Sequence, residues 1–137
     1  MTLVVGRWTS DCEEPVTRIT THVLYTTTGR PAVGMTVHLE ELDGMSASPL
    51  AAARTDAEGR VREWPREGRE GRDGRDWEGV PAGRYRLVFE TGEWFKSSGL
   101  DTLYPEVVVH FEVRGEEPHY HVPLLISPYG YSTYRGT

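Results

Sequence analysis

Hydrophobic and polar residues alternate along several short segments of the chain, a pattern typical of half-buried β-strands. Segment 35–42 shows it most clearly, because Met35, Val37 and Leu39 alternate with polar residues. Other short segments, rich in β-branched and aromatic residues and bounded by turn residues, also predict strands. The predicted strands are 19–25, 35–42, 50–55, 60–64, 84–90, 106–113, 120–126 and 131–135.

One segment, 93–99, has a helical pattern, and we expect one or two helical turns closed by Gly99. Pro123 interrupts the predicted strand 120–126. Because proline has no N–H to donate, we expect an edge strand or a bulge there. Short strands at near-regular spacing with one short helix predict an all-β fold, a β-sandwich.

The 137 residues divide by pattern into an N-terminal extension, 1–17, and one domain, 18–137. The extension has no periodicity. Within the domain, 65–78 consists mainly of glycine, arginine and acidic residues, whose charges nearly cancel. Such a segment has nothing to bury, so we expect a polar loop insertion.

Composition narrows the class of function. The net charge of −6 and a pI near 5.4 argue against nucleic acid or an anionic membrane surface as a partner. No apolar run approaches the roughly 18 residues of a membrane span. Cys12 is the single cysteine, which excludes an intrachain disulfide and fits a reducing compartment. We therefore expect a cytoplasmic protein, with a peroxisomal location as the alternative.

Three features have residue types suited to chemistry: His22 in the first predicted strand, Arg60 at the exit of a turn, and the pair His119 and His121. The paired histidines are two residues apart, so both rings point to one face of a strand. Singly, a strand histidine is more often structural, and an arginine at a turn exit is more often a surface charge. Together the three histidines could bind zinc or transfer protons near neutral pH.

Nucleophilic catalysis has little support in the sequence. There is no Gly-x-Ser-x-Gly elbow, and Cys12 falls in the extension. If the protein is a hydrolase, we expect water to be the nucleophile.

Several motifs, in order along the chain, resemble those of the 5-hydroxyisourate hydrolases, the transthyretin-related proteins of uric acid breakdown. They are Thr-His-Val-Leu at 21–24, Gly-Arg-Pro-Ala at 29–32, Thr-Asp-Ala-Glu-Gly-Arg at 55–60, His-Tyr-His-Val-Pro-Leu-Leu at 119–125 and Ser-Pro-Tyr-Gly-Tyr-Ser-Thr-Tyr-Arg-Gly-Thr at 127–137. The C-terminal motif is the most specific, and the resemblance covers about 19–137.

The resemblance implies a transthyretin-like sandwich of two four-stranded sheets with one short helix. It also implies a homotetramer, a dimer of dimers, whose sites lie where the dimers meet. The implied reaction is cofactor-free hydrolysis of 5-hydroxyisourate to 2-oxo-4-hydroxy-4-carboxy-5-ureidoimidazoline, with no metal. The implied catalytic residues are His22, Arg60 and His121. The implied substrate-binding residues are His119, Tyr134, Arg135, Gly136 and Thr137.

The sequence departs from the family pattern in three places. Thr137 stands where serine is usual, Tyr25 stands where aspartate is common, and the insert at 65–78 is longer and more polar than expected. The main alternative function is a transthyretin-like carrier that binds a small ligand without turnover. A plain β-sandwich interaction module is a further alternative, although it leaves the C-terminal motif unexplained.

Overall fold

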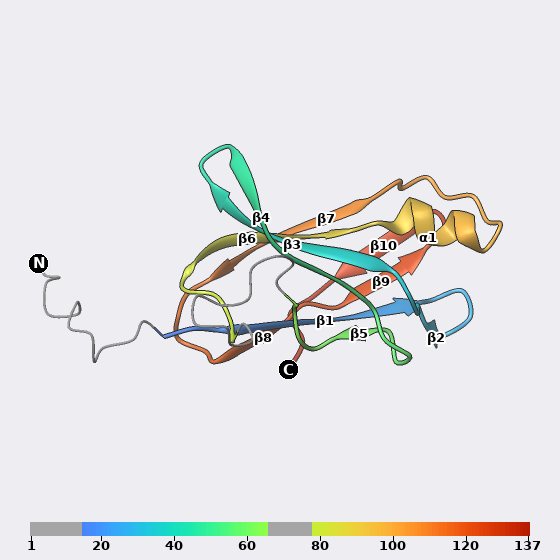
Figure 1. Cartoon of the computed structure of the whole chain (residues 1–137). Coiled ribbons are helices and arrows are strands. Elements are labelled where there is room, and N and C mark those ends of the chain that lie inside the picture. The colour runs from blue at the N-terminus through green and yellow to red at the C-terminus, as the bar shows by residue number, and fades with distance from the viewer. Residues whose placement is uncertain (1–14, 66–77) are drawn as a thin grey trace, which may run out of the picture.

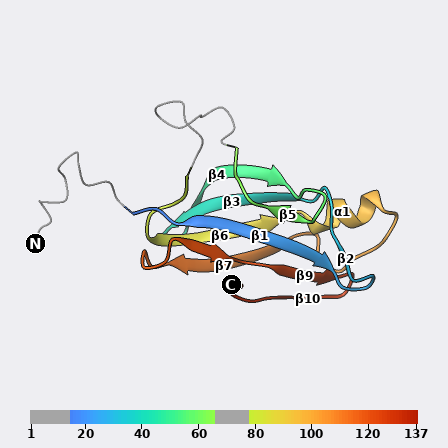
Figure 2. The same ribbon diagram turned by 90° about the horizontal axis from the view of Figure 1, so that it is seen from below.

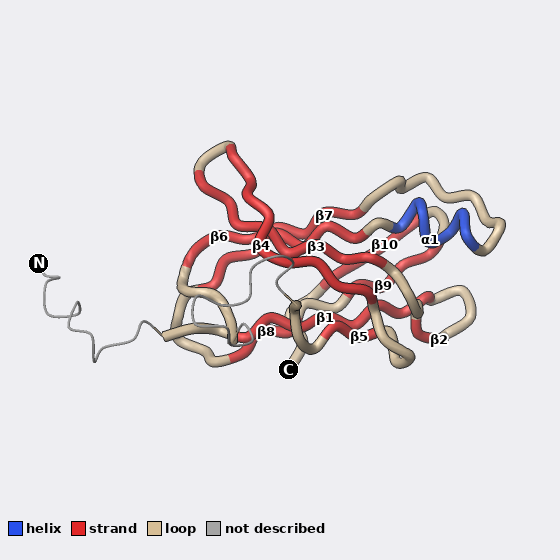
Figure 3. Tube along the Cα trace, viewed as in Figure 1, coloured by secondary structure: helices blue, strands red, loops and turns tan. Residues whose placement is uncertain are grey.

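The computed structural model describes residues 15–65 and 78–137, which form two facing β-sheets with one short helix at one end (Figures 1 and 3). Most of the predicted extension, Cys12 and nearly all of the predicted insert lie outside the described residues. The all-β sandwich expected from the sequence is confirmed. Among the described residues, no helix has the length and hydropathy that crossing a membrane would require.

The first sheet is antiparallel throughout, in the order β4-β3-β6-β7. Its strands are β3 (Thr36–Asp43), β4 (Ser46–Arg54), β6 (Gly83–Phe89) and β7 (Val107–Val113). The alternation in 35–42 has the predicted consequence, since Val37 and Leu39 are fully buried while His38 is partly exposed. Each strand therefore contributes one face to the core.

The second sheet is built around β1 (Arg18–Tyr25) (Figure 2). The other strands are β2 (Arg30–Pro31), β5 (Arg60–Val61), β8 (His119–His121), β9 (Leu124–Ser127) and β10 (Gly130–Thr133). Both β8 and β9 run parallel to β1 in one unbroken register, so they are two parts of one interrupted strand. On the opposite edge of β1, the Val23 N–H donates to the Gly59 carbonyl and the Val23 carbonyl accepts from the Ala32 N–H. β5 and β2 therefore lie end to end along this edge. The six strands thus occupy four positions, and the sheet order is β10-β9-β1-β2.

Several strand predictions were wrong in detail. β4 begins at Ser46 rather than at residue 50, and β2 was not predicted. The predicted strand 120–126 is interrupted after His121, and Pro123 is not at an edge, because β1 lies on one side of it and β10 on the other. The missing N–H is accommodated by a gap in the ladder, while the Pro123 carbonyl accepts a hydrogen bond from Thr133 Oγ1 at 2.7 Å. The predicted strand 60–64 is shorter, ending at Val61.

The helix α1 (Thr91–Ser97) begins two residues earlier than predicted, and Gly99 follows its end with a φ of 74°. Phe95 is fully buried beneath it. The Tyr25 ring meets Trp94 and Phe95 edge to face, at centroid distances of 5.5 and 5.6 Å. Tyr25 therefore packs the end of β1 against the helix.

The core between the sheets is formed by aliphatic and aromatic side chains from both. Its largest fully buried members are Tyr85, Phe89, Phe95, Met35, Leu39, Leu87, Leu124, Ile126, Val23, Val37, Val80 and Val107. Burying a side chain of this size contributes about 1.5–3 kcal/mol relative to exposure. The core therefore holds the two sheets together and leaves their outer faces available for polar residues.

Gly59 is the backbone position that brings the 56–60 turn against β1. Its φ is 77°, and an added Cβ would lie 2.6 Å from the Val23 carbonyl oxygen and 2.9 Å from Pro31 Cβ. Gly44 has a similar φ of 63°, but an added Cβ there would meet nothing within 4 Å. We expect Gly44→Ala to lower the free energy of unfolding by about 1–2 kcal/mol from the left-handed backbone alone.

We expect Gly59→Ala to cost distinctly more than Gly44→Ala, because the methyl group also collides with β1. Chemical denaturation of both variants measures the difference. Equal losses in the two variants would contradict a steric role for Gly59.

Candidate active site

Four of the predicted site residues lie on the outer face of the second sheet: His22, Arg60, His119 and His121. In β1, Ile19, Thr21 and Val23 point into the core, so Thr20 and His22 point outward. His22 is paired with Arg60 of β5, while Thr20 is paired with His121 of β8. Directly paired residues share a face, which places the side chains from three strands together.

Arg60 is positioned by the turn that precedes it. The Asp56 carboxylate accepts hydrogen bonds from the backbone N–H groups of Glu58 and Arg60, both at 2.9 Å. These bonds, first that from Arg60 and then that from Glu58, lower the pKa of Asp56. The Gly59 carbonyl then accepts the Val23 N–H at 2.7 Å. The turn thus delivers Arg60 opposite His22, and the Arg60 side chain remains 36% exposed.

His119 and His121 are joined through Thr20. The Thr20 hydroxyl lies 2.7 Å from His119 Nε2 and 2.8 Å from His121 Nδ1. The two imidazole centroids are 6.3 Å apart, and Thr20 itself is only 7% exposed. Thr20 was not among the site residues predicted from the sequence, although its spacing of two from His22 placed it on the same face.

The surroundings keep all three histidines neutral to lower pH than usual. Burial lowers the pKa of His22, and the Arg60 guanidinium lowers it further. Burial also lowers the pKa of His121, assisted by Arg60 and the other two histidines. For His119, burial and then Arg18 lower the pKa. A neutral imidazole offers an unprotonated ring nitrogen, so these groups are able to accept a proton near pH 7.

The C-terminal residues run beside β8. The Gly136 N–H donates to the His121 carbonyl at 2.8 Å, and a Cβ at Gly136 would lie 2.4 Å from His121 Cδ2. Only glycine therefore lets the chain end pass this close to the imidazole. Tyr134 and Thr137 are exposed in the single chain.

Arg135, in the same C-terminal segment, contacts Tyr120 and Glu117. Its guanidinium carbon lies 4.7 Å from the Tyr120 ring centroid, and its Nη2 lies 3.7 Å from Glu117 Oε1. In this chain Arg135 thus holds the tail to β8. Its assignment to substrate binding stays a prediction.

The described residues do not form the three-histidine zinc site that the sequence left open as an alternative. Among residues 15–65 and 78–137, no three side chains of histidine, cysteine, aspartate or glutamate are grouped so as to hold a metal ion. The hydroxyl of Thr20 occupies the space between His119 and His121 instead.

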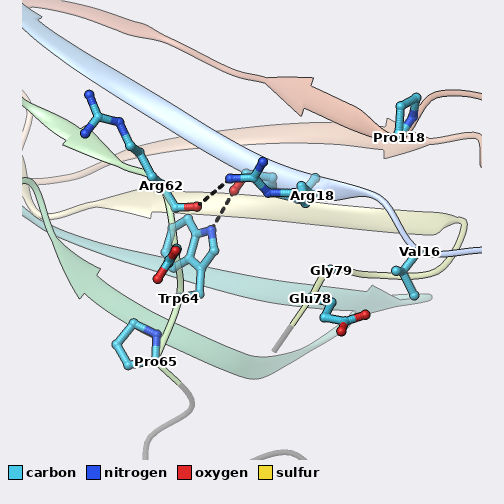
Figure 4. Close-up of a pocket in the computed structure, with 10 residues that line it drawn as sticks. Val16, Arg18, Arg62, Trp64, Pro65, Glu78, Gly79 and Pro118 are labelled. Atoms are coloured by element: carbon cyan, nitrogen blue, oxygen red, sulfur yellow. Dashed lines mark hydrogen bonds between the residues drawn. The ribbon is translucent and has the colours of Figure 1, made fainter. Parts of the chain in front are cut away.

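A groove of about 870 Å³ opens beside the start of β1 (Figure 4). Its walls include Val16, Arg18, Arg62, Trp64, Glu78 and Pro118. Trp64 Nε1 donates to the Ile19 carbonyl at 2.8 Å, and Arg18 Nη2 donates to the Arg62 carbonyl at 3.4 Å. Its lining contains none of the predicted site residues, so this groove is not formed by the face that carries His22 and His121.

Comparison with known proteins identifies close relatives of this chain. Residues 19–136 match the model of the HIUase/Transthyretin family. A 5-hydroxyisourate hydrolase from Caulobacter vibrioides is 43% identical over 123 residues, covering 87% of this chain and 97% of that protein. One from Salmonella dublin is 40% identical over 120 residues, covering 87% and 80%.

The solved structure of Klebsiella pneumoniae 5-hydroxyisourate hydrolase superposes with a TM-score of 0.71 at 36% identity, covering 88% of this chain and 99% of that one. Family model, sequence relatives and solved structure thus agree over most of the chain. The chain belongs to the HIUase/Transthyretin family.

Proposed function

We propose that this protein is an enzyme that hydrolyses 5-hydroxyisourate to 2-oxo-4-hydroxy-4-carboxy-5-ureidoimidazoline in purine catabolism. The observation that carries the proposal is the outer face of the second sheet, where β-pairing groups His22, Arg60 and His121. The relatives named 5-hydroxyisourate hydrolase, at 40–43% identity, support the choice of substrate.

The chemistry follows from the residue types on this face. A neutral imidazole, that of His121 or His22, removes a proton from water as the water oxygen attacks a ring carbonyl. Arg60 stabilises the negative charge that develops on the carbonyl oxygen. The ring carbon–nitrogen bond then breaks, the carbon keeps the new oxygen as a carboxylate, and the leaving nitrogen takes a proton. No covalent intermediate with the protein is needed.

We propose that the working form is a homotetramer, a dimer of dimers that closes the site. Support comes from the partial exposure of His22 and His121 in one chain and from the exposed tyrosines around β10, which are 45–69% exposed at Tyr129, Tyr131 and Tyr134. Exposed aromatic side chains of this kind are typical of interface surfaces. The remaining predicted substrate-binding residues, including Tyr134 and Thr137, would then line the closed site.

Arg60→Ala tests the proposed function directly. We expect wild-type protein to accelerate the ultraviolet decay of freshly generated 5-hydroxyisourate above its spontaneous rate. Removing the guanidinium should lower kcat by about 10²–10³-fold, as losing a transition-state donor does. Arg84→Ala, which removes an exposed arginine from β6 of the other sheet, is the matched control and should keep the wild-type rate. If folded wild-type protein leaves the decay at the spontaneous rate, the carrier alternative is favoured.

The pKa shifts predict the acidic limb of the pH profile. Burial and the nearby cationic and imidazole groups lower the pKa of His22 and His121 below the ordinary 6.5, so each base is more than half unprotonated at that pH. We expect kcat/KM, which reports ionisations of the free enzyme, to fall at acidic pH with a midpoint below 6.5. A midpoint above pH 6.5 would show that the essential base is not one of these histidines.

The tetramer proposal is tested by mass in solution. Sedimentation equilibrium should give a mass four times the 15.5 kDa of one chain at assay concentrations. A monomer with full hydrolase activity would contradict a site completed by assembly.

A further inference from the structure

Among residues 15–65 and 78–137, Thr20 is the one hydroxyl within hydrogen-bond distance of two imidazoles. Its Oγ1 lies at hydrogen-bond distance from His119 Nε2, 2.7 Å, and from His121 Nδ1, 2.8 Å. The β1–β8 pairing fixes this geometry, because Thr20 is opposite His121 and Arg18 is opposite His119. With Thr20 only 7% exposed, little water competes for its hydroxyl.

The single proton of the Thr20 hydroxyl limits how this group can hydrogen-bond the two histidines. A threonine hydroxyl has one proton, so when that proton lies in one of these two contacts, the hydroxyl donates to that ring nitrogen and accepts from the other. In the first arrangement, His121 Nδ1–H donates to Thr20, and Thr20 donates to His119 Nε2. In the reverse arrangement, Thr20 donates to His121 Nδ1, and the proton of His121 is on Nε2.

Only the first arrangement leaves His121 Nε2 free to remove a proton from water. After that transfer the imidazole carries protons on both nitrogens, and its Nδ1–H still donates to Thr20. The hydrogen bonds around the ring thus persist through the step, so no reorganisation accompanies the proton transfer. In the reverse arrangement Nε2 is already protonated and the ring is unable to act as a base there.

We propose that Thr20 is a positioning residue that holds His121 in the tautomer with its proton on Nδ1, with His119 as the acceptor that orients the Thr20 hydroxyl. This proposal rests on the proposed hydrolase function and deepens it, since it assigns the general base to His121 Nε2. It also gives His119 a role through Thr20, beside the substrate contact that the family resemblance implies.

Arg18 helps to keep His119 in the form that this network needs. Protonated His119 would have a proton on Nε2, which would leave the Thr20 hydroxyl without its acceptor. Burial of His119 and the positive charge of Arg18, both of which lower the pKa of His119, favour the neutral ring. The network therefore draws on four residues from two neighbouring strands, Arg18, Thr20, His119 and His121.

The experiment combines kinetics with the tautomer of His121. Protein labelled with ¹⁵N in histidine is studied by NMR above pH 6.5, where protonated and bare ring nitrogens resonate apart, and His121→Asn identifies the His121 signals. The variants are Thr20→Val, which keeps the shape and removes the hydroxyl, and Thr20→Ser, which keeps the hydroxyl. The matched control is Thr91→Val, since Thr91, at the start of α1, is also buried but donates to the Tyr104 carbonyl.

We expect wild-type His121 to carry its proton on Nδ1 and Thr20→Val to shift it toward Nε2. In the same variant kcat should fall about 10- to 100-fold with little change in KM, less than the roughly 10²–10⁴-fold value of a whole general base. Thr20→Ser should restore both the tautomer and kcat. Thr91→Val should lose stability while keeping the wild-type tautomer and kcat.

Three results would overturn the proposal: wild-type His121 protonated on Nε2, an unchanged tautomer in Thr20→Val, or Thr20→Ser no better than Thr20→Val. Even if Thr20→Val does not fold, the wild-type spectrum shows whether His121 carries its proton on Nδ1 or on Nε2. If wild-type protein does not accelerate substrate decay, the proposed function fails, and the NMR result still shows whether Thr20 sets the tautomer.

Discussion

Strand β1 is paired along both of its edges, and the position of every candidate catalytic group depends on that pairing. β8 and β9 pair with one edge, β5 and β2 with the other. Because a strand alternates its faces, the same strand that buries Val23 also presents Thr20 and His22 outward. A slip of one residue in either register would turn His121 or Arg60 to the other face. The geometry of the site therefore depends on the pairing registers of the sheet.

Buried threonine hydroxyls in and beside β1 help to fix those registers. Thr21 donates to the Val122 carbonyl at 2.6 Å, and Thr17 donates to the Glu117 carbonyl at 2.8 Å. Each bond of this kind contributes roughly 1 kcal/mol and ties β1 to a segment about a hundred residues away. The Thr21 bond also satisfies a carbonyl next to the gap that Pro123 leaves in the ladder. Thr20 differs from these two, because its hydroxyl contacts imidazoles rather than carbonyl groups.

The C-terminal segment and the candidate active face depend on each other. Gly136 pairs with His121 through the backbone, and its lack of a side chain admits the tail beside the imidazole. Arg135 anchors the same tail through Tyr120 and Glu117. Specific contacts of Arg135 and Gly136 thus fix this segment against β8. Arg135 and Gly136 of the C-terminal motif thus have a structural reason for their residue types, since each makes a contact that depends on its side chain or on the lack of one.

The sequence by itself determined most of the strands, the inward face of 35–42 and the short helix, because alternation, turn residues and glycine act locally. Its motifs also selected His22, Arg60 and His121, which the sheet brings to one face. Only the tertiary structure decided that Pro123 sits inside the sheet and that Thr20 joins two histidines 99 and 101 residues away. The reason is physical: local pattern fixes which face a side chain takes, whereas its neighbours on that face depend on which strands pair and in what register.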